Sequence, residues 1–324
     1  MKILFVYQAL PTFIKKDLDI LRSAHTVREV HFRGINDIPK LWGGVKWCDV
    51  SFSWFGSIHA FWSVLFTKLL KKKSIVVAGG YDVGQKDGLW SQRTKRWCPY
   101  YAFSNADIIL TVSNYNHEEA IRNISANPMK MKRIYHGFDP IKTRRVPNIE
   151  RQDLVVTVSE IARHQIRRKG LELFVTAAAL LPEVNFVLIG AWIDNSIDHL
   201  RRLSTPNVKF TNFIGDKDMS NILSEAKVYV QISEHEAFGC AIAEAMLCEL
   251  IPVVSKNAAI PEVVGECGYY VDRLDHVELA EKIRLALKDS QTGRRARERI
   301  VNNFPLERRK EELLKAISLL GDQR

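Results

Sequence analysis

A short, continuous apolar run limits the folds that this chain can adopt. Ser74-Ile75-Val76-Val77-Ala78 shows no alternation of apolar and polar residues, which is typical of a strand covered by helices on both faces of a parallel sheet. Such runs alternate with helical patterns up to about residue 140, and the alternation restarts at Leu154–Val158. The polar, proline-bearing stretch 140–152 between them is typical of a linker. The 324 residues therefore predict an α/β protein with two Rossmann-like parallel-sheet domains facing a cleft.

The predicted domain boundaries follow from these patterns. The first domain is expected over residues 1–142 and the second over 153–304, and an amphipathic helix is expected over 305–324. No apolar run approaches the roughly 20 residues that span a bilayer, and the first seven residues are too short an apolar run for a signal peptide. The five cysteines form no C-x-x-C pair and no zinc-like cluster with histidine, which predicts reduced thiols in a cytoplasmic protein without a metal site.

The net charge of +10 is concentrated in the first half of the chain. Residues 1–150 carry 23 Lys and Arg against 12 Asp and Glu, whereas residues 151–324 carry 24 against 25. This asymmetry predicts an anionic partner for the first domain, such as the inner face of a membrane, a lipid-linked acceptor or an acidic glycan. A solvated basic surface is the alternative. No motif of a nucleic-acid-binding domain is present, so nucleic acid is not expected as a partner.

The stretch from Ser233 to Met246 is the strongest site signal. It follows the strand-like run Val228–Ile232, contains a loop with Gly239, and opens a helical run. Backbone N–H groups and the helix dipole converge in such a loop and favour phosphate. Glu236 and Glu244 would repel a bare anion, but carboxylates accept hydrogen bonds from hydroxyl groups. The combination predicts a site for a nucleotide-sugar.

A basic loop, residues 162–169, follows the first strand of the second domain. Four cations within seven residues suit a diphosphate. The charge of a leaving nucleoside diphosphate grows as the glycosidic bond breaks, so fixed cations stabilise the transition state more than the ground state. We expect Lys169, next to Gly170, to bind the diphosphate, and we expect Arg167 and Arg168 to be solvated.

A third candidate loop, Gly79–Gly84, lies beyond the strand Ser74–Ala78, where ligands bind in open α/β sheets. Gly80 would let the backbone approach a ligand, and Tyr81 and Asp82 offer polar contacts. The alternative is a plain turn, because these residue types are common in turns. The following segment, 85–104, is rich in Lys, Arg, Trp and Tyr and could hold an acceptor loop.

Several of these motifs together resemble one known family. Glu236-x-Phe238-Gly239-x-x-x-x-Glu244-Ala245-Met246, with Pro252-Val253-Val254 and Ile260–Gly265 after it, resembles the donor-binding signature of the retaining glycosyltransferases of family 4, or group 1, which have the GT-B fold. Lys169-Gly170 resembles the diphosphate-binding element of that family. Tyr135–Asp139 resembles the run that closes its first domain, and Ala78–Val83 resembles a run found in some members.

The resemblance implies a metal-independent enzyme without a cofactor. It would move a hexosyl group from a nucleotide-sugar to a glycan or lipid-linked acceptor with retention of configuration, and the last helix would pack back on the first domain. The implied donor-binding set consists of Glu236 for the sugar hydroxyls, Phe238, Gly239 and Cys240 for sugar and phosphate, Glu244 for the ribose, and Lys169 for the diphosphate. The family's arginine five residues before this lysine has no clean match, since His164 holds that spacing; Arg163, one residue further away, is the candidate.

The first domain departs most from the family. The loop Gln8–Thr12 lacks the usual glycines, and Gly80-Tyr81-Asp82 stands where many members carry a histidine. Gly80, Tyr81 and Asp82 are therefore the expected acceptor-side residues, with Asp82 as a catalytic substitute beside Glu236 and Lys169. Two other functions remain open: a nucleotide-sugar epimerase of the same fold, and a non-catalytic protein that binds a nucleotide-sugar or an anionic glycan.

Overall fold

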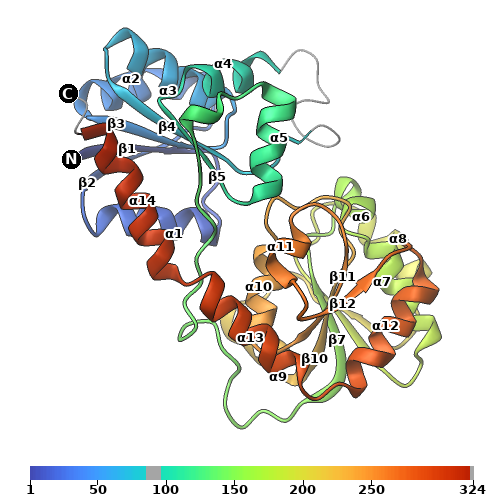
Figure 1. The fold of residues 1–324 in the computed structure, drawn as a ribbon. Coiled ribbons are helices and arrows are strands. Elements are labelled where there is room, and N and C mark those ends of the chain that lie inside the picture. Colours follow the sequence, from blue (N-terminus) through green and yellow to red (C-terminus); the bar gives the residue numbers. More distant parts are fainter. Residues whose placement is uncertain (85–95, 322–324) are drawn as a thin grey trace. The chain divides into compact units, whose positions relative to one another are not determined.

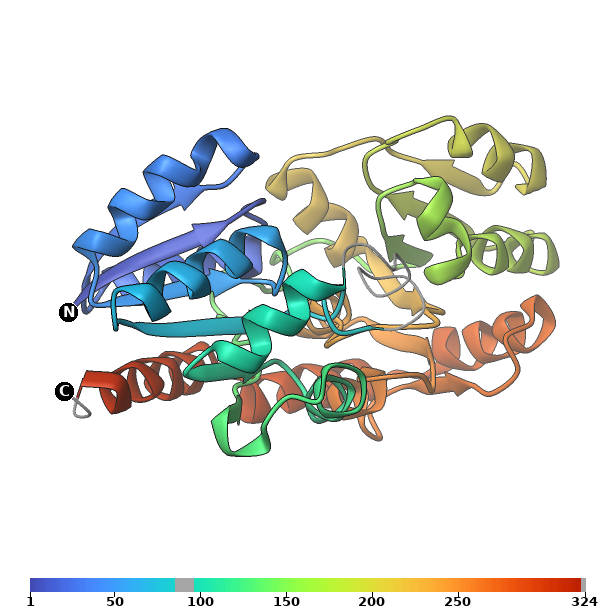
Figure 2. The same cartoon turned by 90° about the horizontal axis from the view of Figure 1, so that it is seen from above.

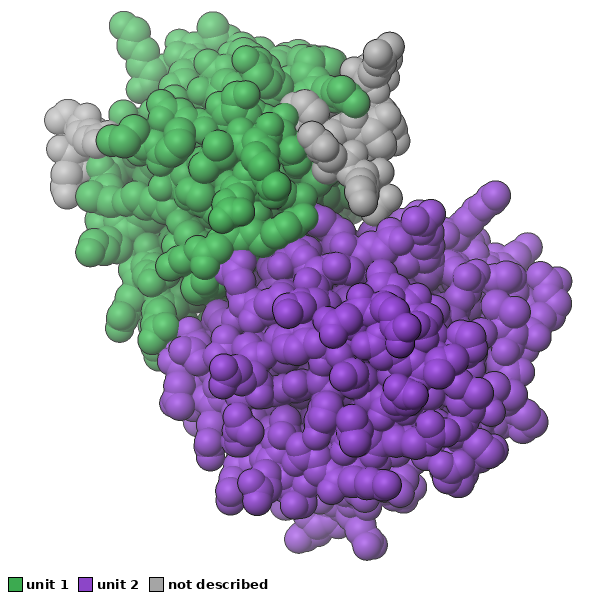
Figure 3. Space-filling model, turned by 45° about the vertical axis from the view of Figure 1, so that its right-hand side comes forward, with its two compact units in different colours: residues 1–137, 306–324 green, residues 138–305 purple. Residues whose placement is uncertain are grey.

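The computed structural model describes residues 1–84 and 96–321. The chain forms two compact units (Figure 3). Unit 1 contains residues 1–137 and the chain from residue 306 onward, and unit 2 contains residues 138–305. The last helix therefore belongs to the same unit as the N-terminus, and the chain passes between the units at residues 137–138 and 305–306.

Unit 1 is built on a six-stranded parallel sheet with the strand order β2-β1-β3-β4-β5-β6 (Figure 1). Its strands are β1 (Lys2–Tyr7), β2 (Thr26–His31), β3 (Val50–Trp54), β4 (Lys73–Ala78), β5 (Ile108–Thr111) and β6 (Met131–Arg133). Its described helices are α1 (Thr12–Arg22), α2 (Ile38–Trp47), α3 (Ile58–Leu69), α4 (Trp97–Asn105), α5 (Asn114–Ile124) and α14 (Leu306–Gly321). Strands β3 and β4 are buried almost throughout, as the continuous apolar sequence of β4 predicts.

Helices cover both faces of the unit 1 sheet. Helix α3 packs against α2 and α4, and α4 contacts α5, whereas α1 contacts α14. Parallel crossovers are right-handed, so the connection that steps from β1 outward to β2 lies on the opposite face from those that step from β3 towards β6. Helix α14 thus completes the face that α1 alone would leave partly open (Figure 1).

A buried ion pair fixes α14 to the rest of unit 1. The guanidinium of Arg309 donates to both carboxylate oxygens of Asp17, over 2.6 and 2.7 Å, and to the backbone carbonyls of Ile134 and Tyr135. Trp54 Nε1 donates to Asp17 over 3.1 Å. Asp17 is 0% and Arg309 3% exposed. Buried charges persist only when they are paired and hydrogen-bonded, and here each charge has several partners.

Unit 2 repeats the architecture, with the strand order β12-β11-β10-β7-β8-β9, all parallel. Its strands are β7 (Gln152–Val158), β8 (Asn185–Ile189), β9 (Val208–Phe210), β10 (Ala226–Gln231), β11 (Ile251–Ser255) and β12 (Tyr269–Val271). Its helices are α6 (Arg163–Arg168), α7 (Leu171–Ala177), α8 (Ser196–Leu203), α9 (Asp216–Glu225), α10 (Cys240–Leu247), α11 (Ile260–Val264), α12 (His276–Lys288) and α13 (Thr292–Asn303). Helix α7 contacts both α8 and α12, and α10, α11 and α13 contact one another (Figure 2).

Each sheet has one switch point, at which the connections leave in opposite directions. It lies between β1 and β3 in unit 1 and between β7 and β10 in unit 2. In open parallel sheets the loops at the carboxyl ends of such strands form the ligand site. No helix among the described residues is long and apolar enough to cross a membrane. The fold confirms the predicted class, two Rossmann-like α/β sheets.

Candidate active site

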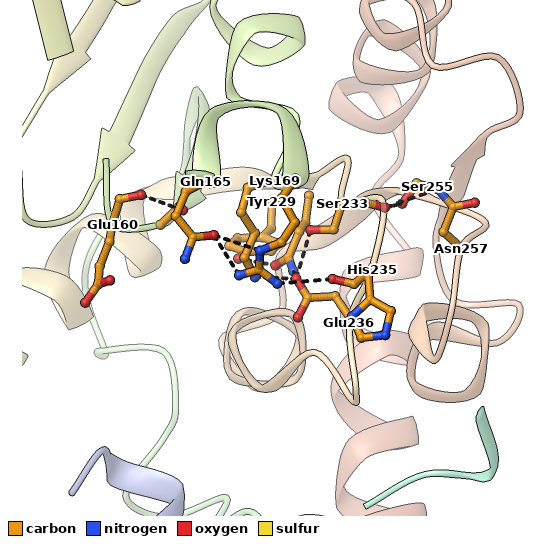
Figure 4. A network of polar contacts seen from close by, with 12 residues as sticks. Glu160, Gln165, Lys169, Tyr229, Ser233, His235, Glu236, Ser255 and Asn257 are labelled. Carbon is orange, nitrogen blue, oxygen red and sulfur yellow. Dashed lines mark hydrogen bonds and ion pairs between the residues drawn. The ribbon is translucent and has the colours of Figure 1, made fainter. Parts of the chain in front are cut away.

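A polar cluster centred on Glu236 occupies the switch point of unit 2 (Figure 4). One carboxylate oxygen, Oε1, accepts hydrogen bonds from Lys169 Nζ, from Gln231 Nε2 over 2.5 Å and from Ser233 Oγ over 2.8 Å. Gln231 ends β10 and in turn accepts a bond from Tyr229 of the same strand, over 2.8 Å. The other oxygen of Glu236, Oε2, takes no part in these three bonds and can accept from a hydroxyl group.

Glycine at position 170 brings Lys169 to this cluster. Gly170 has a φ of +65°, and a Cβ at this position would lie 2.4 Å from the carbonyl oxygen of Ile232. Only glycine adopts this backbone readily, so the turn between α6 and α7 can lie against the loop after β10. The Arg168 carbonyl also accepts from the Glu234 N–H over 2.8 Å. These two contacts hold Lys169 beside Glu236.

The carboxyl group of Glu236 is ionised at neutral pH. Burial opposes ionisation of Glu236, but the charge and hydrogen bond of Lys169, aided by Arg168 and Ser233, outweigh it, so the pKa of Glu236 lies below its usual value. The side chains of Lys169 and Glu236 are 18% and 12% exposed. Lys169 thereby balances the carboxylate that would otherwise repel a phosphate, and the site can hold an anion and hydroxyl groups side by side.

Helix α10 starts directly after Gly239, which has a φ of +102°. Cys240 is its first residue and is partly exposed. The ring of Phe238 is 2% exposed and packs against Phe138 and Phe304, at 5.9 and 5.3 Å between ring centroids. The Phe238 side chain therefore holds the loop in the core of unit 2.

Glu244, one turn into α10, lies near the same cluster. Burial is the main cause that raises the pKa of Tyr229, and the charges of Glu236 and Glu244 raise it further. The charges of both acids that the sequence singled out therefore act on one tyrosine of β10.

The arginines of the basic loop differ in exposure, and not in the way that the sequence predicted. Arg163 starts α6, at the opposite end from Lys169, and its side chain is exposed. Arg168 is partly buried, donates to Gln165 over 2.6 and 3.0 Å, and lies 3.5 Å from the carbonyl oxygen of His235. Arg167 is 89% exposed and pairs with Glu234. Arg168, expected to be solvated, is therefore the second cation of the cluster, while Arg167 is solvated as expected.

Asp82 lies at the carboxyl edge of the unit 1 sheet. One of its oxygens accepts from the N–H of Gly56 over 2.7 Å, and the other accepts from those of Gly79 and Gly80 over 3.0 Å each. It is 0% exposed. Burial raises its pKa to about 6, while the bonds from the three glycines act against that rise. The carboxylate joins the loop after β4 to the loop after β3, a geometry that favours a positioning role over direct contact with a substrate.

We expect Asp82→Ala to lower the free energy of unfolding by about 1–3 kcal/mol, because buried backbone N–H groups lose their acceptor. Thermal unfolding measures the change. Tyr81→Ala is the matched control: this neighbour is 54% exposed, and such surface changes usually stay within about 0.5 kcal/mol. An Asp82→Ala variant as stable as Tyr81→Ala would contradict the positioning role.

The other acceptor-side residues lie around Asp82. Gly80 has a φ of +109° and is buried, and Tyr81 next to it is exposed. Of the segment 85–104, residues 85–95 lie outside the described residues, and the rest enters α4.

Sequence reasoning missed the partners of Glu236 on β10. Tyr229 and Gln231 are two residues apart and therefore share a face of the strand, and a glutamine inside an apolar strand was the available signal.

Sequence reasoning also missed Gln8, Ser57 and His59, which form a hydrogen-bonded group at the switch point of unit 1. Nothing local marks that group, because Gln8 follows β1 whereas Ser57 and His59 follow β3.

The family model of the glycosyl transferases group 1 matches residues 141–304, which is half of the chain. The chain belongs to this family. The matched region spans unit 2 almost completely and includes the Lys169–Glu236 pair, so the pair lies in the part of this glycosyltransferase that the family shares.

Curated relatives of this glycosyltransferase include a mannosyltransferase and a synthase. O-antigen chain mannosyltransferase B of Escherichia coli is 26% identical over 203 residues, covering 58% of this chain and 53% of that protein. The chain thus spans about half the length of this relative. Alpha-maltose-1-phosphate synthase of Mycolicibacterium smegmatis is 24% identical, over 90% of this chain and 79% of that one.

Solved structures share the fold over nearly the whole glycosyltransferase. The Anabaena protein HepE in complex with UDP has a TM-score of 0.83 at 17% identity, covering 98% of this chain and 100% of that chain. WaaG, a glycosyltransferase involved in lipopolysaccharide biosynthesis, has a TM-score of 0.71 at 16% identity, covering 96% and 98%. These similarities show the GT-B fold.

Proposed function

We propose that this glycosyltransferase transfers a hexosyl group from a nucleotide-sugar to a glycan or lipid-linked acceptor, with retention of anomeric configuration. The pairing of Lys169 with Glu236 beside the start of α10 carries the proposal. Lys169 and the backbone N–H groups at Gly239 and Cys240 would bind the diphosphate, and Glu236 would accept from the sugar hydroxyls. Glu244 would hold the ribose.

The leaving diphosphate determines the role of the cations. Its negative charge grows as the glycosidic bond breaks, so Lys169, together with Arg168 as the structure suggests, would stabilise the transition state more than the bound donor. With these fixed charges the proposed transfer needs no metal ion. Relatives support the class of donor, since HepE was solved with UDP and with UDP-glucose.

The net positive charge of unit 1 supports an anionic acceptor. Unit 1 carries 25 Lys and Arg against 14 Asp and Glu, and unit 2 carries 22 against 23. We propose that unit 1 binds the acceptor and makes peripheral contact with an anionic membrane surface, because basic protein surfaces are attracted to acidic lipids.

A donor screen tests the function. Thermal unfolding with UDP-, GDP- and ADP-sugars selects the donor, and its turnover is then followed with and without an acceptor extract, in EDTA. We expect one donor to stabilise the protein and to yield nucleoside diphosphate and a glycosylated product. A changed sugar nucleotide without transfer would indicate an epimerase instead, and binding without turnover would indicate a binding protein.

A further inference from the structure

Strands β1 and β3 lie side by side at the switch point of unit 1 (Figure 1). A row of hydrogen-bonded side chains crosses this point. Ser57, after β3, places its Oγ 2.8 Å from Oε1 of Gln8, after β1. The same Oγ lies 2.7 Å from Nδ1 of His59, and His59 Nε2 lies 2.6 Å from the carbonyl oxygen of Trp54. His59 is 0% and Ser57 8% exposed, whereas Gln8 is exposed. This row of side chains thus runs from the core of unit 1 to its surface.

The backbone of Gln8 is held from the other side. His31, the last residue of β2, places Nε2 2.9 Å from the carbonyl oxygen of Gln8. Gln8 is therefore fixed through its main chain by the end of β2 and through its side chain by the loop after β3. An exposed glutamine with two such restraints is preorganised for binding.

The available protons determine how the Gln8 amide is turned. The Trp54 carbonyl can only accept, so Nε2 of His59 carries the proton. Burial lowers the pKa of His59 to about 4, so the ring is neutral at pH 7 and Nδ1 accepts the single hydroxyl proton of Ser57. The hydrogen bond between Ser57 and Gln8 therefore needs a donor from Gln8. Exchanging the amide oxygen and nitrogen of Gln8 supplies it, so that the NH₂ group faces Ser57 and the carbonyl oxygen faces outward.

We infer that Gln8 contacts the sugar acceptor, its outward carbonyl oxygen accepting a hydrogen bond from an acceptor hydroxyl, and that Ser57 and His59 are positioning residues that fix this orientation. The orientation sets the chemistry: an outward NH₂ would suit a phosphate, whereas an outward carbonyl oxygen suits a hydroxyl. The inference deepens the proposed function and rests on it, because it names the acceptor-side group at the second switch point.

The first test reads the proton positions directly. In the full chain with ¹⁵N-labelled histidine and glutamine side chains, NMR at pH 7.5 should show His59 protonated at Nε2 and bare at Nδ1. The Gln8 NH₂ protons should exchange slowly with water, and Ser57→Ala should accelerate that exchange about tenfold or more. A doubly protonated His59, or a Gln8 amide whose exchange is unchanged in Ser57→Ala, would overturn the inferred orientation.

The second test uses methyl α-D-mannopyranoside and methyl α-D-glucopyranoside as hydroxyl probes. Titration should shift the Gln8 amide signals, and Ser57→Ala should weaken this binding about fivefold to tenfold. Ser63→Ala is the matched control, since the buried Ser63 Oγ in the same helix as His59 has no hydrogen-bond partner among the described residues. Unshifted Gln8 signals, or equal binding by both variants, would overturn the contact. Neither test needs turnover, so a failure of the proposed transfer would appear separately, in the donor screen.

Discussion

Replacing Lys169 by methionine is expected to lower the turnover number for the nucleotide-sugar by about 10²–10³-fold, the usual effect of losing one preorganised group that stabilises transition-state charge. Lys169 is bonded to Glu236 and only 18% exposed, so water screens its charge weakly. Steady-state kinetics with the donor found in the screen measure the loss.

The same variant should change the titration of Glu236. In the wild type, burial would raise the pKa of this carboxyl, but Lys169 holds it below the usual value. Without the lysine, the pKa rises, so the acid limb of the pH–rate profile should move to higher pH. Glu236→Gln combined with Lys169→Met should be little worse than either change alone, since groups that act as a unit are strongly non-additive.

Arg167→Ala is the control for Lys169, because it removes a cation of the same loop whose side chain is 89% exposed. Its turnover should stay close to that of the wild type. A folded Lys169→Met variant that turned over the donor as fast as Arg167→Ala would show that the diphosphate is bound elsewhere.

The second large effect is expected in the core of unit 1. Arg309→Ala or Asp17→Ala should lower the free energy of unfolding by about 3–5 kcal/mol, since each leaves a buried charge without its counterion. Asp17 and Arg309 are 0% and 3% exposed, and two hydrogen bonds join them directly. Chemical denaturation followed by tryptophan fluorescence measures the loss.

A double-mutant cycle isolates the pair. The variant with both alanines should be more stable than the sum of the single losses predicts, because no unpaired charge remains. Arg308→Ala, at the exposed neighbouring position of the same helix, should change stability by less than about 0.5 kcal/mol. Additive losses at Asp17 and Arg309 would contradict a direct ion pair.

Local patterns were sufficient for the sheets and for half of the residues that the structure gathers in the candidate site. The continuous apolar runs predicted the buried strands, and the spacing of Glu236, Gly239 and Glu244 predicted the strand–loop–helix unit because all three lie within one crossover. Lys169 was found for the same reason, as it adjoins the glycine that the turn requires.

The remainder depends on distances that a sequence does not show. Arg163 and Arg168 are equally basic in the sequence, but they lie at opposite ends of the six-residue helix α6, and of the two only Arg168 lies near the carbonyl oxygen of His235. Asp17 and Arg309 are 292 residues apart. Gln8 meets Ser57 only because β1 and β3 are neighbours while β2 lies outside them.

The return of α14 to unit 1 determines the order in which the two units can complete their cores during protein synthesis. Unit 2 lies within the sequence of unit 1, so the ribosome makes every residue of unit 2 before it makes Arg309. At roughly 5–20 residues per second, the growing chain holds Asp17 without its counterion for at least several seconds while unit 2 is completed. The unit that comes second in the sequence is thus the first able to finish its core, and the nascent N-terminal segment is the one that chaperones would need to shield.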